Sequence, residues 1–497
     1  MQQKASKPFT YQTRPFIEEK LDDILSNQAI LLSKVERHLY KDRYKKNKNI
    51  NELKSLYLKR FGITARQFNS CRIKLEGKVR SYRELLKRNI CLLEDKIKKL
   101  KKHIQKLKDP LKSHQKKRRL YLLESKLKKR KKDKEENKIR ICFGSKKLFQ
   151  KQFHLEENGY LSHAEWKEDW EDARNSAFFL VGSKDETAGN QSCQLIKTKN
   201  SFTLHLRLPN GFSEKTLVLE NSTFGYGTEE LTYCLEENEK RKRLRLAKKE
   251  YSHFGKALNF LFKKDKKGWR VFVTIEKETP DLKSKNSIGT IGIDINADHI
   301  AFSETDRCGN IINKKTFSCT TYGKSKNQSL AIIGDVSKEI IKMASLAEKP
   351  VVLEDLNFEK KKTDLREKSG KYSRMLSSFS YNKIIDSIET KAFKEGIKIY
   401  KVNPAFTSII GKVKFACRYG LSDHHAAAFV IARRACNYSE RPPGCLEVIG
   451  NKKSKSAFSL PERNREKHVW NFYSELSKEL KAANVLHKST KYRSSRP

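Results

Sequence analysis

The order of apolar segments between residues 288 and 436 constrains the fold of this chain more than any other feature. Apolar strands at 291–295, 299–303 and 311–317 are separated by turns, which predicts three successive antiparallel strands. Apolar residues then recur at helical spacing from Leu330 to Ile341. The segments that follow alternate between strand and helix, at 350–354, 384–393, 397–402 and 423–436. This β-β-β-α-β-α-β-α order predicts a mixed α/β domain built on one sheet.

Three acidic residues occupy positions that such a fold would bring together. Asp294 lies inside the apolar strand Ile-Gly-Ile-Asp-Ile-Asn, and Glu354 ends the strand Val-Val-Leu-Glu. Asp423 opens the last helix directly after Ser422, where the helix dipole favours an ionised carboxylate. A charge in an apolar strand is costly to bury unless it has a partner or a metal ion.

A few convergent carboxylates suit phosphodiester hydrolysis. Two Mg²⁺ ions about 4 Å apart activate the attacking water and stabilise the leaving oxygen. Mg²⁺ prefers hard oxygen ligands and keeps several of its waters, so three carboxylates suffice. Each acid alone is explained as a turn former, an ion-pair partner or a helix-start residue, and Asp355 is an alternative to Glu354. A metal site is favoured only because all three acids occur at positions that the predicted order of strands and helices would bring together.

The charge balance points to a polyanionic partner. The chain has 107 Lys and Arg against 59 Asp and Glu, a formal net charge of +48. Such a surplus repels itself unless a polyanion neutralises it, and nucleic acid is the commonest one. An anionic membrane is the rival partner, but no apolar run approaches the roughly 18 residues of a spanning helix, and residues 1–11 lack the apolar core of a signal peptide. We expect a cytoplasmic, nucleoid-associated bacterial protein with neither a membrane partner nor a small-molecule substrate.

The ten cysteines are scattered singly and form no C-x-x-C pair. This pattern argues against a zinc ribbon and against a disulfide framework. We expect reduced thiols and no zinc.

Residues 17–138 are helical in pattern and very basic. One seam alternates steps of four and three, and it consists of Leu86, Ile90, Leu93, Ile97, Leu100, Ile104 and Leu107. Asp109–Pro110 breaks the helix, and the same spacing restarts at Leu120. The pattern predicts an antiparallel helical hairpin, with a coiled-coil dimer as the competing interpretation.

Roughly half of residues 96–132 are Lys or Arg, and only Asp109 and Glu124 oppose them. A solvated helix face would normally carry interspersed charges of opposite sign, so a surface that tracks phosphates is the better explanation. A second basic cluster spans residues 240–249. The candidate nucleic-acid contacts are Lys116, Lys117, Arg118, Arg119, Lys128, Lys129, Arg130, Lys240, Arg241, Lys242 and Arg243.

Three segments of the α/β region resemble the RuvC motifs of the TnpB family, transposon-encoded relatives of the compact type V CRISPR effectors. They are Ile-Gly-Ile-Asp-Ile-Asn (291–296), Val-Leu-Glu-Asp-Leu (352–356) and Gly-Leu-Ser-Asp-His-His-Ala-Ala-Ala-Phe-Val-Ile-Ala-Arg-Arg (420–434). Residues 402–408 also resemble the segment that precedes the third motif. The resemblance covers residues 290–435 well, and it implies an RNase H-like (RuvC-type) domain, an arrangement that the order of elements also matches. Over the N-terminal half it is a resemblance of layout only.

The resemblance implies an RNA-guided DNA endonuclease that binds a guide RNA, opens double-stranded target DNA and cuts it at one RuvC site. It assigns catalysis and the ligation of two Mg²⁺ ions, for which Mn²⁺ can substitute, to Asp294, Glu354 and Asp423, which selects Glu354 over Asp355. TnpB proteins usually carry a four-cysteine zinc element before the last aspartate. Here that interval holds only Cys417, so the chain resembles a branch that lacks zinc, which puts substrate loading in question.

The same layout predicts an α/β multidomain protein. Residues 1–16 would supply the first strand of a wedge-like β-barrel, and residues 17–138 a basic helical recognition lobe. Residues 139–286, rich in alternating strands such as Ser201–Leu208 and Trp269–Ile275, would complete a small wedge-like β-barrel. Residues 287–497 would form the RuvC-like nuclease domain, with a C-terminal helix on the Val469–Leu480 stripe and a disordered tail beyond His487.

Three other functions compete with guided cleavage. A non-cleaving RNA-guided DNA-binding regulator or transposition accessory protein would be expected to lack one of the three acids. A guide-free RNase H-like transposase or resolvase explains the acids but not the basic N-terminal half. A non-enzymatic RNA-binding scaffold leaves the acids unexplained.

Overall fold

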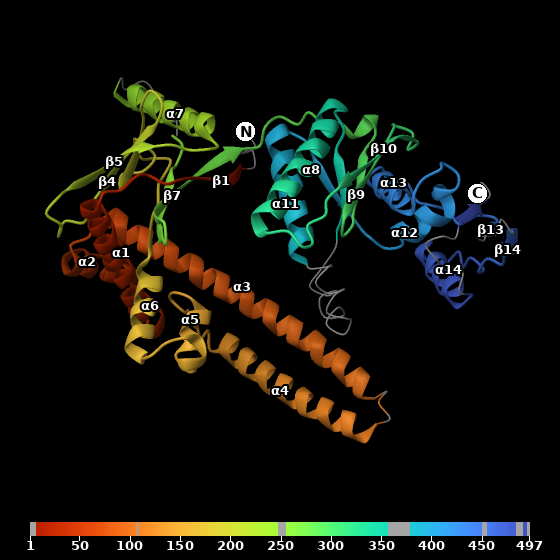
Figure 1. The fold of residues 1–497 in the computed structure, drawn as a ribbon, viewed down its shortest axis with the longest axis horizontal. Coiled ribbons are helices and arrows are strands. Elements are labelled where there is room, and N and C mark those ends of the chain that lie inside the picture. Colours follow the sequence, from red (N-terminus) through yellow and green to blue (C-terminus); the bar gives the residue numbers. More distant parts are fainter. Residues whose placement is uncertain are drawn as a thin grey trace. The chain divides into compact units, whose positions relative to one another are not determined.

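A computed structural model describes residues 6–105, 107, 109–246, 255–355, 378–449, 455–483 and 491–494 (Figure 1). The chain divides into two compact units, Ala5–Glu278 and Thr279–Pro497, and Met1–Lys4 is grouped with the second. Each unit has its own hydrophobic core. Among the described helices, none is long and apolar enough to cross a lipid bilayer.

The first unit contains a four-stranded antiparallel sheet in the order β1-β7-β6-β2. Its strands are β1 (Ser6–Thr13), β2 (Ala177–Leu180), β6 (Asn259–Asp265) and β7 (Gly268–Glu278). β1 pairs along its whole length with β7, from Ser6 opposite Glu278 to Thr13 opposite Val271. The strand predicted at the start of the chain is therefore confirmed.

A second antiparallel sheet in this unit has the order β3-β4-β5. It is built from β3 (Cys193–Lys197), β4 (Phe202–Arg207) and β5 (Thr216–Ser222), and α7 (Thr228–Leu246) follows it. Within the described ranges the two sheets share no paired strands, although residues of both belong to one hydrophobic core, so the small wedge-like barrel stays a prediction. An alternating pattern defines which face of a strand is buried but leaves its pairing partner open.

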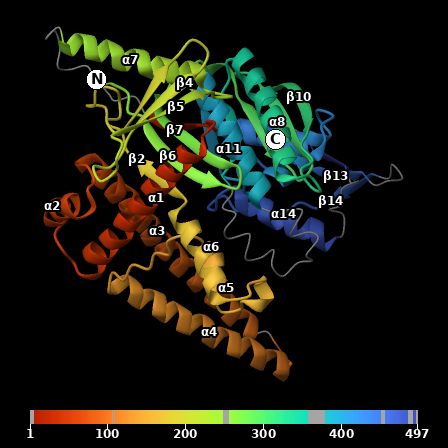
Figure 2. The same ribbon diagram turned by 60° about the vertical axis from the view of Figure 1, so that its left-hand side comes forward.

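The helical part begins with α1 (Glu19–Tyr40), the π-helix η1 (Lys41–Lys45) and α2 (Ile50–Phe61). The long helices α3 (Ala65–Ile104) and α4 (Pro110–Glu135) then lie side by side in opposite directions (Figures 1 and 2). Ion pairs join the two helices, Lys131 to Glu94 at 2.7 Å and Lys101 to Glu124 at 2.8 Å. The predicted antiparallel hairpin is confirmed.

Between the hairpin and β2 lie α5 (Lys146–Lys151), the 3₁₀-helix η2 (Glu156–Asn158) and α6 (His163–Asn175). The rings of Trp166 and Trp170 stack at 6.0 Å, and Phe149 packs against Trp170 at 5.3 Å. The sequence predicted mainly strands from residue 141 onward, so the helices in this segment are a difference from that prediction.

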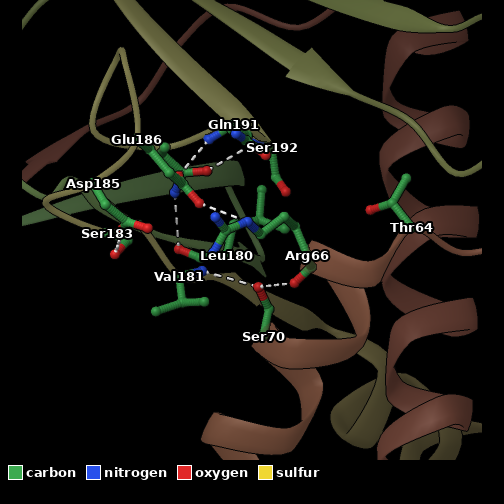
Figure 3. Close-up of polar contacts among 12 residues, drawn as sticks. Thr64, Arg66, Ser70, Leu180, Val181, Ser183, Asp185, Glu186, Gln191 and Ser192 are labelled. Carbon is green, nitrogen blue, oxygen red and sulfur yellow. Dashed lines mark hydrogen bonds and ion pairs between the residues drawn. The ribbon is translucent and has the colours of Figure 1, made fainter. Parts of the chain in front are cut away.

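A buried carboxylate ties the loop between β2 and β3 to the start of α3 (Figure 3). The Glu186 side chain is 0% exposed and lies 2.8 Å from Nε of Arg66. It also accepts the backbone N–H of Gln191 at 2.7 Å, while Ser70 Oγ accepts the N–H of Val181 at 3.0 Å. Burial raises the pKa of Glu186, and the N–H of Gln191 and the charge of Arg66 offset this only in part.

The second unit is built on a five-stranded sheet in the order β10-β9-β8-β11-β12. Its strands are β8 (Ile291–Ile295), β9 (His299–Thr305), β10 (Ile311–Ser318), β11 (Val351–Glu354) and β12 (Ile399–Val402), and its main helices are α8 (Lys326–Leu346), α11 (Ser378–Glu395) and α13 (Asp423–Ala435). β8, β9 and β10 are antiparallel, whereas β11 runs parallel to both of its neighbours. The predicted β-β-β-α-β-α-β-α order is confirmed.

Helices cover both faces of this sheet. Ile291, Ile293, Val351 and Leu353 form a core with α8 and α11 on one face, and these two helices lie side by side (Figure 1). On the other face α13 lies against β8 and β9. A Cβ added at Gly292 would lie 1.9 Å from the carbonyl oxygen of Ala428, so glycine is required for α13 to approach β8 this closely.

The C-terminal part adds α12 (Thr407–Ile410), the π-helix η4 (Gly411–Ala416) and α14 (Trp470–Ala482), the helix predicted from the Val469–Leu480 stripe. A small sheet follows the order β14-β13-β15, with β13 (Leu446–Ile449), β14 (Lys455–Phe458) and β15 (Lys491–Ser494). The tail beyond His487 was predicted to be disordered, and for residues 491–494 this is wrong. Backbone pairing with β13 forms β15, although its Lys-Tyr-Arg-Ser sequence carries no apolar pattern.

Candidate active site

The first two predicted acids lie on adjacent parallel strands. β11 pairs with β8 in the register Val351 opposite Ile291, and Asp294 and Glu354 each stand three residues further along. Alternate residues of a strand point to the same face. Since Ile291 and Val351 face α8 and α11, Asp294 and Glu354 face the opposite side, which α13 covers. Asp355, the alternative acid, follows the end of β11 and is exposed.

The third acid stands at the first turn of α13. Ser422 caps this helix by accepting the backbone N–H of His425 at 3.2 Å. The backbone oxygen of His425 in turn accepts a hydrogen bond from Ser303 of β9 at 2.8 Å. These contacts hold the N-terminal end of α13, and with it Asp423, against the sheet face that carries Asp294.

Asp294 is linked to the start of α13 through an imidazole. Its Oδ2 lies 3.1 Å from Nδ1 of His424 and accepts a hydrogen bond from Asn296 at 3.0 Å. The Asp294 side chain is 16% exposed. The hydrogen bond to Asp294 raises the pKa of His424, and the charges of Asp423 and Asp298 act in the same direction. His424 therefore lies close to both the first and the third predicted acid.

Glu354 is held by the first residue of α12. The hydroxyl of Thr407, which is 2% exposed, donates to Oε1 of Glu354 at 2.6 Å. The preceding residue, Phe406, adopts the left-handed region with φ 62°. A bulky residue there costs about 1–3 kcal/mol, and such strain is typical of functional sites. The strained turn at Phe406 leads directly into the residue that orients Glu354.

Asp423 forms an ion pair with a lysine of η4. Nζ of Lys412 lies 3.1 Å from Oδ2 of Asp423, and the two side chains are 10% and 41% exposed. A Cβ at the neighbouring Gly411 would lie 2.6 Å from the backbone of Ala426, so η4 is packed tightly on α13. A largely buried ammonium thus provides a fixed positive charge beside the third predicted acid.

Tyr381 of α11 lies close to the predicted acids. Burial raises the pKa of its phenol, and the charges of Glu354, Asp294 and Asp355 raise it further. Glu354 and Asp294 therefore both lie within electrostatic range of this half-buried side chain. Sequence reasoning did not identify Tyr381, Thr407, Lys412 or His424 as part of this site. A lysine inside the apolar run Ile-Ile-Gly-Lys-Val-Lys-Phe-Ala was a usable signal, because a buried lysine requires a partner.

The donor chemistry of the three acids fits Mg²⁺, which prefers carboxylate oxygens. In the described part of the chain, however, no three His, Cys, Asp or Glu side chains gather closely enough to hold one metal ion. Asp294, Glu354 and Asp423 instead contact His424, Thr407 and Lys412, respectively. Asp294 and Glu354 lie on one face of the sheet, Asp423 begins the helix that covers this face, and a protein donor contacts each of the three.

The predicted nucleic-acid contacts on α4 are mostly exposed; Lys116 and Arg130 are half-buried. Within the described residues none of the seven forms an ion pair with an acid, unlike Lys112, Lys131 and Lys132 of the same helix. The seven are Lys116, Lys117, Arg118, Arg119, Lys128, Lys129 and Arg130. Their charges are thus available to a ligand.

The predicted contacts on α7 differ from one another. Lys240, Lys242 and Arg243 are exposed, and Arg243 lies 3.7 Å from Glu239. Arg241 donates to the backbone carbonyls of residues 184, 185 and 186 at 2.7, 2.8 and 2.9 Å. Its guanidinium therefore stabilises the loop that carries Glu186. The remainder of this cluster, from residue 247 to 249, lies outside the described residues.

No protein-family model matches the chain, and no curated protein matches its sequence. Among solved structures, the chain is similar to a Cas12f1–sgRNA–target DNA complex, with 13% identity, a TM-score of 0.34, and coverage of 86% of this chain and 99% of that one. It is also similar to the RuvC of T. thermophilus bound to a Holliday junction substrate (14% identity, TM-score 0.22, 29% of this chain and 90% of that one). A Cas12i–crRNA–dsDNA complex is similar at 10% identity and a TM-score of 0.27, over 81% of this chain and 65% of that one. With TM-scores of this size, the site residues must carry any functional conclusion.

Proposed function

We propose that this protein is an RNA-guided DNA endonuclease with an RNase H-like, RuvC-type active site formed by Asp294, Glu354 and Asp423. One observation carries the proposal: two of the acids lie at the same level of adjacent parallel strands, and the third begins the helix that covers their face. The resemblance of residues 291–296, 352–356 and 420–434 to TnpB motifs supports the same assignment.

Asp294, Glu354 and Asp423 would hold Mg²⁺, or Mn²⁺ in its place. When bound, the metal supplies an activated water and stabilises the charge on the leaving oxygen. The protein orients the carboxylates: Thr407 fixes Glu354, and Asn296 restrains Asp294.

A guide RNA and double-stranded target DNA are the proposed partners. The surplus of +48 charges favours binding to phosphates, as do the cations of α4 that form no ion pair with a described residue. Contacts from lysine to phosphate position a nucleic acid without reading its sequence. Pairing with a guide would supply the specificity that such a surface lacks.

The test combines cleavage with binding. Asp294→Ala, Glu354→Ala and Asp423→Ala should each abolish cleavage of a guide-matched plasmid while RNA and DNA affinities change little, because the carboxylates act in the chemical step. Asp355→Ala is the matched control and should cleave normally. Sequencing the RNA that copurifies with the full chain supplies the guide for this assay.

The outcomes separate the competing functions. Wild-type protein that binds guide and target but never cuts would support the non-cleaving regulator. Cleavage that needs no RNA would support a transposase or resolvase. If the Glu354→Ala variant cleaves fully and the Asp355→Ala variant does not cleave, Asp355 and not Glu354 is the catalytic acid.

A further inference from the structure

A cavity lies at the base of the α3–α4 hairpin, within the first unit. It is lined by residues of α3, by Tyr44 of η1 and by the end of α4 with the segment that follows, and its volume is about 620 Å³. Pockets that bind small molecules or single ligand groups commonly measure about 300–1,000 Å³. Its size therefore suits one nucleotide.

The cavity carries an excess of positive charge. Each of its acidic residues already has a cationic partner. The pairs are Glu76 with Arg72 at 3.1 Å, Glu84 with Lys87 at 2.9 Å, and Asp133 with Arg140 at 2.9 Å. Four further lining cations, Arg80, Arg83, Lys134 and Lys138, form no ion pair with any described residue. An anion would therefore be attracted to this site.

The interior of the cavity offers aromatic and apolar surface. Tyr44 and Tyr82 line it, together with the buried side chains of Val79 and Leu86. The hydroxyl of Tyr82 is buried and has no hydrogen-bond partner among the described residues. Since this oxygen is inaccessible, a ligand in the cavity would contact the ring of Tyr82 and not its hydroxyl.

One turn shapes the wall that carries two of the lining residues. Asn137 adopts the left-handed region with φ 48°, and its side-chain oxygen accepts a hydrogen bond from Arg83 at 3.2 Å. The turn directs the chain from the end of α4 to Lys138 and Ile139, both of which line the cavity. A cation and an apolar side chain are thus placed on the wall opposite α3.

We propose that this cavity binds a single unpaired nucleotide of an RNA strand. The base lies against the rings of Tyr44 and Tyr82, and the phosphate contacts Arg80 and Lys138. Stacking on aromatic rings combined with cations for the backbone is the general way in which proteins hold unpaired nucleotides. The inference rests on the proposed function in one respect, that RNA is the partner of the hairpin.

The first test uses the full chain, freed of RNA, in calorimetric titrations with adenosine 5′-monophosphate, its deoxy form and inorganic phosphate. We expect one nucleotide per chain, with phosphate alone at least tenfold weaker because it makes no ring contact. Tyr82→Ala should weaken nucleotide binding by roughly five- to a hundredfold, the effect of losing one contact between a base and an aromatic ring. Tyr121→Ala, the same change at an exposed tyrosine of α4, is the control and should have no effect.

The second test measures binding of a fluorescein-labelled single-stranded RNA against salt. The Arg80→Gln/Lys138→Gln variant should reduce the log–log salt slope by about 0.7 to 1.4, as expected for one or two phosphates on a single strand. Lys199→Gln/Lys266→Gln removes the same charge from two exposed turns and should retain most of the slope. Thermal unfolding of each variant verifies that it folds.

The outcomes distinguish the two proposals. Suppose that the wild type binds RNA and that all cavity variants bind nucleotide and RNA as tightly as the wild type does. This result would overturn the proposed nucleotide site but leave the proposed function standing. Wild-type protein that binds no RNA would overturn the proposed function as well. If phosphate binds as tightly as the nucleotide, the cavity is only an anion site. If the deoxynucleotide binds more tightly than the ribonucleotide, the cavity is a DNA site. Either result overturns the inference.

Discussion

The ion pair between Lys412 and Asp423 makes one of the proposed catalytic acids a structural residue as well. At the observed Nζ–Oδ2 distance of 3.1 Å, Coulomb attraction amounts to about 5 kcal/mol at an effective dielectric constant of roughly 20 and about 1.3 kcal/mol in water. Lys412 is 10% exposed and Asp423 is 41% exposed, so the pair is screened on one side only. We expect a coupling free energy of about 1–3 kcal/mol for this pair.

A double-mutant cycle measures this coupling. Asp423→Ala, Lys412→Met and the double variant are compared by native-state hydrogen exchange in EDTA, with the slowest amides of β8 and β11 reporting the unfolding of the second unit. The Asp423→Ala variant should be destabilised because Lys412 keeps its charge and loses this partner. The double variant should recover part of that loss, because the positive charge is removed as well.

Cleavage assays on the same proteins separate stability from chemistry. Both proteins that lack Asp423 should remain inactive, including the restabilised double variant, whereas Lys412→Met should still cut. A coupling free energy near zero would refute the energetic argument. Cleavage by the double variant would show that Asp423 acts only as the partner of Lys412.

Three further predictions follow from the charges. Cleavage should require Mg²⁺ or Mn²⁺ and cease in EDTA, and elemental analysis should find no stoichiometric zinc because the chain has no C-x-x-C pair; one zinc per chain would contradict this. Replacing Lys116, Lys117, Arg118 and Arg119 with Gln should flatten the salt dependence of RNA binding and should weaken the binding of unrelated RNA sequences to a similar extent. An unchanged salt slope would mean that these residues face solvent only. Burial raises the pKa of Glu186, so the folded state binds this proton more tightly than the unfolded state. The stability of wild type relative to Glu186→Gln should therefore fall as pH rises through the ordinary carboxyl range and the raised pKa, and a urea denaturation series in which this difference rises would disprove the sign.

The sequence predicted those parts of the fold that periodicity determines. The steps of four and three between Leu86 and Leu107, together with the break at Asp109–Pro110, were sufficient for the hairpin, because helix contacts are local in sequence. The order of strands and helices in the second unit was predictable for the same reason. The pairing of strands in the first unit was not predictable. β1 pairs with β7, which lies more than 250 residues away in the sequence, and no local sequence pattern identifies that partner.

The candidate site divides in the same way. Asp294 and Glu354 could be identified because an acid in an apolar strand is conspicuous. Thr407 could not, because its role depends on the left-handed turn at Phe406, which brings an ordinary hydroxyl to Glu354. Tyr381 could not either, since only the packing of α11 places its phenol near the acids.

Positive charge and hydrogen-bond donors surround the three acids of the candidate site. Carboxylates near one another in a partly buried site repel unless positive charge or hydrogen bonds offset the repulsion. His424 is close to Asp294 and Asp423, and Lys412 is bonded to Asp423. Together with Thr407 on Glu354, these two groups give each of the three carboxylates a protein partner. The positive charge of Lys412 opposes an incoming divalent cation, so the strength of its contact with Asp423 should set how much metal the site requires.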